Sequence, residues 1–209
     1  MNKLEFGNPK ANIVLIQMVD DHDLEGIERE AGLISQHAMQ DFHLMALKVG
    51  NWNNDLSPWQ AKAVFGKEDF GGGADATLKE VLDLCTDRSK TYYIGGYSLS
   101  ALFALWAAYQ TDIFEGVAAA SPSIWFPEFV DYMEKNDLKA SKVYLSLGNK
   151  EEKIRNPVMA KVGDDIRRAH AILQKKQIVT TLEWNPGNHF RDPDIRTSKA
   201  FLWVMSQTT

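Results

Sequence analysis

The residues around Ser98 have the types and the spacing of a nucleophile elbow. Ser98 lies in the run GGYSLS at 95–100, between an apolar run typical of a strand and an apolar run typical of a helix. An elbow holds its serine on a strained strand-to-helix turn, and small flanking residues let this turn pass close to neighbouring strands. Gly96 supplies one small residue, whereas Ser100 stands where glycine is usual. The pattern predicts a nucleophilic Ser98, the alternative being a glycine-rich turn with a capping serine.

A serine hydroxyl is a weak nucleophile until a base takes its proton, so this chemistry requires a histidine. His189 is the candidate because it lies in the turn-rich run WNPGNHF at 184–190, between the last predicted strand and the last predicted helix. This position satisfies the chain order serine, acid, histidine. His37, His43 and His170 lie in predicted helices or at the start of a strand, where surface or packing roles are expected.

The carboxylate that orients the histidine is expected after the strand that follows the elbow unit. The strand KVYLSL at 142–147 ends at a glycine, and Glu151 lies three residues beyond that glycine. We predict Glu151 as the acid, with Glu152 as the reserve candidate. Asp164 and Asp165 fit less well because they lie in the next predicted helix.

Two backbone donors should stabilise an oxyanion formed on the substrate. One is the N–H of Leu99, directly after the nucleophile, and the other is expected in the loop after the first strand, at Val19 within 18–20. The glycine triplet at 71–73 is a rival, but it follows a different strand and is better interpreted as a turn.

Aromatic residues in the irregular segments 51–74 and 121–132 are candidates for the walls of a substrate pocket. The alternative is that they anchor these loops on the core. The acidic run DDHD at 20–23 is expected to hold solvated charges and a helix start, and we predict no metal site. The pocket candidates are Trp52, Trp59, Trp125 and Phe126.

Short apolar runs alternate with helical patterns along the chain, which predicts a mostly parallel sheet covered by helices on both faces. In such sheets the ligand lies at the carboxyl ends of the strands, where the predicted nucleophile, acid and base fall. Strands are predicted over 11–19, 43–49, 91–95, 116–120, 142–147 and 178–183, and helices over 24–40, 77–85, 99–109, 158–174 and 194–206.

Composition limits the alternatives. The 209 residues carry 23 Lys and Arg against 28 Asp and Glu, a net charge of −5 that argues against nucleic-acid binding. One cysteine, Cys85, excludes an internal disulfide framework, and no apolar run approaches the roughly 18 residues of a membrane span. We expect one domain over residues 1–209, a cytoplasmic location and no cofactor.

The motifs together resemble the esterase D-like and enterochelin (siderophore) esterase-like family of α/β-hydrolases. The resemblance covers nearly the whole chain and is carried by GGYSLSALFALWA at 95–107, VAAASPSIWF at 117–126 and LGNKEEKIRN at 147–156, with NPGNHF at 185–190 as the histidine loop. It implies a minimal α/β-hydrolase fold without a separate lid domain. It also implies Ser98 as nucleophile, Glu151 as acid and His189 as base.

The leading hypothesis is therefore a serine esterase acting on a small-molecule ester through an acyl-enzyme. Two alternatives stay open: acyl transfer to an acceptor other than water with the same residues, and a binding module that keeps the fold without turnover. The sequence identifies neither the ester nor the oligomeric state, for which a homodimer is one option.

Overall fold

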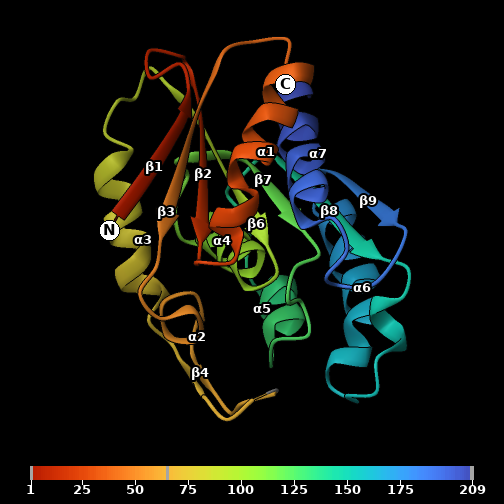
Figure 1. Cartoon of the computed structure of the whole chain (residues 1–209). Helices are drawn as coiled ribbons and strands as arrows, with labels where there is room; N and C mark the ends of the chain where they lie inside the picture. The colour runs from red at the N-terminus through yellow and green to blue at the C-terminus, as the bar shows by residue number, and fades with distance from the viewer. Residues whose placement is uncertain (1, 65, 208–209) are drawn as a thin grey trace.

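A seven-stranded sheet forms the centre of the computed structural model, which describes residues 2–64 and 66–207 (Figure 1). The strand order is β1-β3-β2-β6-β7-β8-β9, and every neighbouring pair is parallel except β1 with β3. The predicted mostly parallel sheet is thus confirmed. The strands are β1 (Asn2–Gly7), β2 (Ile13–Val19), β3 (Phe42–Lys48), β6 (Thr91–Tyr97), β7 (Phe114–Ala120), β8 (Lys142–Gly148) and β9 (Val179–Asn185).

Helices cover both faces of this sheet, as predicted. α1 (Asp23–His37) and α7 (Pro193–Ser206) pack side by side on one face, and α7 contacts β6, β7 and β8 (Figure 1). On the other face, α4 (Leu99–Gln110) packs on β6 and β7, and α6 (Val162–Lys175) packs on β8 and β9. α3 (Ala74–Leu84) joins the same apolar core through its buried side chains.

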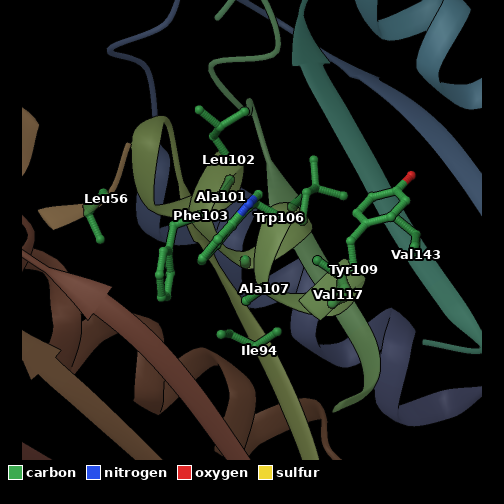
Figure 2. Close-up of a cluster of buried hydrophobic side chains, with 14 of the residues drawn as sticks. Leu56, Ile94, Ala101, Leu102, Phe103, Trp106, Ala107, Tyr109, Val117 and Val143 are labelled. Carbon is green, nitrogen blue, oxygen red and sulfur yellow. The ribbon is translucent and has the colours of Figure 1, made fainter. Parts of the chain in front are cut away.

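Helix α4 is apolar on all sides because it is buried on all sides. Its residues from Leu99 to Tyr109 are all buried, which removes the need for a polar face. Figure 2 shows part of this cluster, with Phe103 and Trp106 of α4 lying near Ile94 of β6 and Val117 of β7. The helix that begins at the elbow is therefore fixed by packing along its whole length.

The structure adds elements that the sequence does not predict. β1 is exposed along most of its length and has no apolar run, so its pairing with β3 through the backbone leaves little trace in the sequence. The irregular segment after β3 contains α2 (Trp52–Asp55) and the short hairpin of β4 (Gln60–Ala61) and β5 (Phe70–Gly71). In the segment after β7, where a loop with helical turns is expected, the structure has α5 (Phe129–Lys135), which contacts α6. Among the described residues, no helix is long and apolar enough to cross a membrane.

Candidate active site

Ser98 lies on a strained turn between β6 and α4. Its backbone has φ 57° and ψ −121°, a conformation that costs a non-glycine residue free energy and persists only where the surroundings enforce it. The end of β7 and the loop after it supply that enforcement, since the Ser98 N–H donates to Ala120 O at 3.3 Å and the Ser98 carbonyl accepts from Ser123 N at 3.0 Å. Gly96 makes the turn feasible, because a Cβ there would lie 2.1 Å from Ser100 Oγ.

Ser100, the residue that departs from the usual elbow, has a structural partner. It is fully buried, and its Oγ donates to the carbonyl of Met18 in β2 at 2.8 Å. The hydroxyl therefore ties the start of α4 to the neighbouring strand. Serine fits at this position because its polar atom is satisfied there.

The structure brings Ser98, His189 and Glu151 together. His189 follows β9, and its Nε2 lies 3.0 Å from Ser98 Oγ while its Nδ1 lies 2.7 Å from Glu151 Oε2. The reserve acid Glu152 lies away from the histidine, with its Oε2 3.0 Å from Nη2 of Arg167. A continuous hydrogen-bonded chain thus runs from hydroxyl to imidazole to carboxylate.

Glu151 is held as a carboxylate although it is buried. Its Oε1 accepts from the backbone N–H of Gly148 at 2.7 Å, from Ser121 Oγ at 2.9 Å and from Nη1 of Arg196 at 2.9 Å. Burial acts to raise the pKa of Glu151, but the hydrogen bonds from His189, Gly148 and Ser121 outweigh it and leave this pKa below its ordinary value. A charged Glu151 can fix the tautomer of the histidine and stabilise its protonated form.

Arg196 of α7 is a site residue that sequence analysis misses. The guanidinium is buried, and besides binding the carboxylate it donates through Nη1 to Tyr97 OH at 2.9 Å and through Nη2 to the carbonyls of Pro186 and Asn188. Tyr97 in turn donates to the carbonyl of His189 at 2.6 Å. Arg196 therefore fixes the loop that carries the histidine. In the sequence it is one polar residue in a helical pattern, with nothing to mark its burial.

The proposed backbone donors differ in how the structure places them. Leu99 is the first residue of α4, so its N–H has no partner within the helix and lies directly after Ser98. Val19 is the last residue of β2 and is buried, while the following residue, Asp20, lines the cavity beside Ser98. Of the rival glycine triplet, Gly72 directly follows β5, and its N–H donates to Ser57 Oγ.

His189 lines two cavities. A cavity of about 600 Å³ contains Ser98 and is bounded by Trp52, Tyr97 and a set of acidic residues. A second cavity of about 340 Å³ contains Glu151 and is mainly apolar. Phe190 lines both cavities beside His189 and is 85% exposed. The apolar cavity is lined by Trp125, Ile154, Met159 and Val162, with Lys150 and Lys153 among its polar residues.

Two of the four predicted pocket aromatics line these cavities and two do not. Trp52 lines the larger cavity and Trp125 the smaller one. Trp59 and Phe126 instead pack against each other with ring centroids 5.6 Å apart, and Trp59 Nε1 donates to the carbonyl of Pro127. Their assignment to the pocket wall is corrected: they anchor their loops on the core, as their apolar surface favours.

The acidic run at 20–23 serves the start of α1. Asp20 Oδ1 accepts from the backbone N–H groups of His22 and Asp23, and Asp23 Oδ2 lies 3.3 Å from Asp20 N. This reciprocal arrangement satisfies free N–H groups at the beginning of a helix. Within residues 2–64 and 66–207, no group of three or more His, Cys, Asp or Glu side chains is placed to hold a metal ion.

Comparison with known proteins supports the fold. No protein-family model and no curated protein matches the chain. An IroE-like serine hydrolase from Shewanella oneidensis matches 92% of this chain and 70% of its own, with a TM-score of 0.73 and 16% identity. The siderophore hydrolase EstB from Aspergillus nidulans matches 93% of this chain and 83% of its own, with a TM-score of 0.68 and 15% identity. An enterochelin esterase from Shigella flexneri matches 96% of this chain but 53% of its own, with a TM-score of 0.66 and 12% identity.

These similarities show that the chain has an α/β-hydrolase fold, as predicted. They also confirm, at the level of the fold, the resemblance to enterochelin esterase-like proteins. Because the identities are low and one fold hosts many activities, the function must be argued from the site.

Proposed function

We propose that this protein is a serine hydrolase of small-molecule carboxylic esters, with Ser98 as nucleophile, His189 as base and Glu151 as the acid that orients the base. The observation that carries the proposal is the position of His189, whose two ring nitrogens lie 3.0 Å from the serine hydroxyl and 2.7 Å from the carboxylate. A histidine held on both sides in this way can take a proton from serine on one nitrogen while the other is fixed by the acid.

The reaction follows from these contacts. Ser98 Oγ attacks the ester carbonyl while His189 Nε2 takes the hydroxyl proton, and the Leu99 N–H donates to the developing oxyanion. Collapse of the tetrahedral intermediate breaks the ester bond, and His189 returns the proton to the leaving alkoxide. Water, deprotonated by the same histidine, then attacks the acyl-enzyme; the acid is released and Ser98 regains its proton.

The surroundings of the site agree with an ester substrate. The cavity that contains Ser98 has a volume of about 600 Å³, which is room for a small ester, and it shares His189 and Phe190 with the apolar cavity. The three solved structures compared above are described as a serine hydrolase, a siderophore hydrolase and an enterochelin esterase. Those names support ester hydrolysis as the class of reaction and leave the substrate of this chain open.

A fluorophosphonate probe tests the nucleophile. We expect the protein to be labelled and Ser98→Ala to abolish both labelling and hydrolysis of 4-nitrophenyl acetate. Ser123→Ala is the matched control, because Ser123 Oγ lies only 3.3 Å from Ser98 Oγ and its backbone N–H is retained. Undiminished labelling of Ser98→Ala would overturn the assignment. Labelling with turnover only in the presence of added alcohols would instead establish acyl transfer.

A further inference from the structure

The larger cavity has an acidic half that the proposed reaction does not use. It extends from Ser98 into the space between α1 and α7, next to the carboxyl end of β2. Five carboxyl groups line it, whereas the cavity-lining residues include no lysine or arginine. The five are Asp20, Asp23, Glu25, Glu30 and Asp194.

Two of the polar residues in this half are buried with unpaired atoms. Gln17 and Glu30 are each only 3% exposed and both line the cavity. The Gln17 Nε2 lies 3.4 Å from Glu30 Oε2, but the Oε1 atoms of both residues are buried without a hydrogen-bond partner. A buried polar atom left without a partner costs about 1–3 kcal/mol, so such atoms call for an explanation.

Packing does not supply that explanation. Gln17 is the one polar residue of β2, and Glu30 occupies the buried face of α1 together with Ile27 and Ala31. An apolar residue at either position would continue the core between the sheet and α1. These two residues therefore interrupt an apolar face at the point where it meets the cavity.

Three of the other carboxylates make local contacts, and burial together with the charge of Asp20 raises the pKa of Asp23 to about 6. Asp20 and Asp23 cap α1, and Asp194 Oδ2 lies 2.9 Å from Nη1 of Arg29, which is largely exposed. Burial raises the pKa of Glu30 well above its ordinary value, and the charges of Asp23 and Asp194 raise it further. The acidic half of the cavity thus combines buried, unpaired oxygen atoms with surrounding carboxyl groups. This combination favours a ligand that brings both positive charge and N–H donors.

We propose that this acidic half is a subsite for a primary ammonium group, and that the substrates of this protein are esters carrying such a group several bonds from the scissile carbonyl. The N–H donors of an ammonium would satisfy the free Oε1 atoms of Gln17 and Glu30, and its charge would be balanced by the surrounding carboxylates. Trp52 lines the same cavity and offers an aromatic surface to a cation. The substrate class rests on the proposed hydrolysis, whereas ammonium binding does not.

Ligand binding tests the subsite apart from catalysis. In Ser98→Ala, isothermal titration should show that hexylammonium binds at least tenfold more tightly than 1-hexanol. Glu30→Gln in that background should weaken hexylammonium binding about tenfold, as expected for loss of a hydrogen bond to a charged group. Asp23→Asn should also weaken binding, because it removes one of the negative charges that surround the ammonium. The matched control is Glu28→Gln, an exposed residue of α1 outside the cavity, which should leave binding unchanged.

Turnover then tests the substrate class. The wild-type protein should show a kcat/KM for the 4-nitrophenyl ester of 6-aminohexanoate at least tenfold above that for the heptanoate ester, and Glu30→Gln should reduce this ratio. Equal binding of hexylammonium and hexanol would overturn the subsite while leaving the hydrolase intact. Conversely, selective hexylammonium binding in a protein that neither reacts with fluorophosphonate nor cleaves esters would refute the proposed function and the substrate class that rests on it, while the ammonium subsite would stand.

Discussion

Glu151 is the residue at which the contacts of the site converge. One of its oxygens faces His189, and the other accepts three hydrogen bonds from the backbone of Gly148 and the side chains of Ser121 and Arg196. The second oxygen is thus fully occupied, so the carboxylate cannot rotate away from the imidazole without losing several hydrogen bonds. This position explains how a buried acid stays charged and why it can hold the histidine in one orientation.

A comparison of two adjacent glutamates tests that role. Glu151→Gln keeps the shape of the side chain but removes the charge that fixes the tautomer of His189, and we expect kcat to fall by a factor on the order of 10³ to 10⁴. Glu152→Gln is the control, because Glu152 pairs with Arg167 at the surface and should retain kcat within about twofold. Steady-state kinetics with 4-nitrophenyl acetate measures both. Equal losses in the two variants would contradict the assignment.

Residue types and chain order suffice to predict which side chains meet at this site, but not what supports them. Ser98, His189 and Glu151 each follow a predicted strand, and the carboxyl ends of parallel strands share one edge of the sheet. Arg196 could not be predicted in this way because its role depends on burial between α7 and the histidine loop. Trp59 shows the opposite error, because it is predicted to line the pocket but packs on the core. The sequence around an aromatic residue in a loop does not distinguish these two positions.

Among the elements, the elbow depends on the contact between the start of α4 and β2. The strained backbone of Ser98 is held from β7 by hydrogen bonds, whereas Ser100 secures the helix to Met18 on the opposite side. Where an elbow usually has a glycine that lets the backbone pass close to its neighbours, this chain has Ser100, which forms a side-chain hydrogen bond to β2 instead. Apolar runs in the sequence predict α4 and both strands, but they do not reveal this contact.

Substitutions of Ser100 separate the contribution of its hydrogen bond from the effect of a glycine in the helix. Ser100→Gly removes the hydrogen bond, worth about 0.5–1.5 kcal/mol, and adds the backbone entropy of glycine in a helix, about 0.5–1 kcal/mol. We expect a loss of about 1–2.5 kcal/mol in the free energy of unfolding, with the proposed hydrolysis of 4-nitrophenyl acetate retained because Ser98 keeps its other contacts. Urea denaturation measures the loss, and Ser100→Ala serves as the control that removes the hydrogen bond alone. Unchanged stability in both variants would show that the Ser100–Met18 contact contributes nothing.

At the scale of the whole molecule, the sheet separates two apolar cores of different character. The core on the α4 side is continuous, while the core beneath α1 and α7 ends at the buried pair Gln17 and Glu30. The alternation of strands and helices predicts helices on both faces of the sheet. No pattern in the sequence predicts that the acidic cavity reaches into the core beneath α1 and α7. A buried acid that weakens the fold is the kind of residue that function retains against stability.

The pH dependence of stability tests this cost of Glu30. In the folded protein the pKa of Glu30 is raised, first by burial and then by Asp23 and Asp194, well above its ordinary value of 4.5. Below the unfolded pKa the group is protonated in both states, so its contribution to stability is fully present. As the pH rises through the folded pKa, that contribution is lost because the unfolded state ionises more readily.

Glu30→Gln cannot ionise, so its stability relative to the wild-type protein should increase between pH 4.5 and 8. Urea denaturation at a series of pH values measures the difference in the free energy of unfolding, and this difference cancels the titration of the groups that do not interact with Glu30. Glu28→Gln, on the exposed face of the same helix, should show no such trend. A difference between Glu30→Gln and wild type that stays constant over this range would mean that Glu30 is already ionised in the folded protein, and the acidic cavity would then carry one more fixed negative charge.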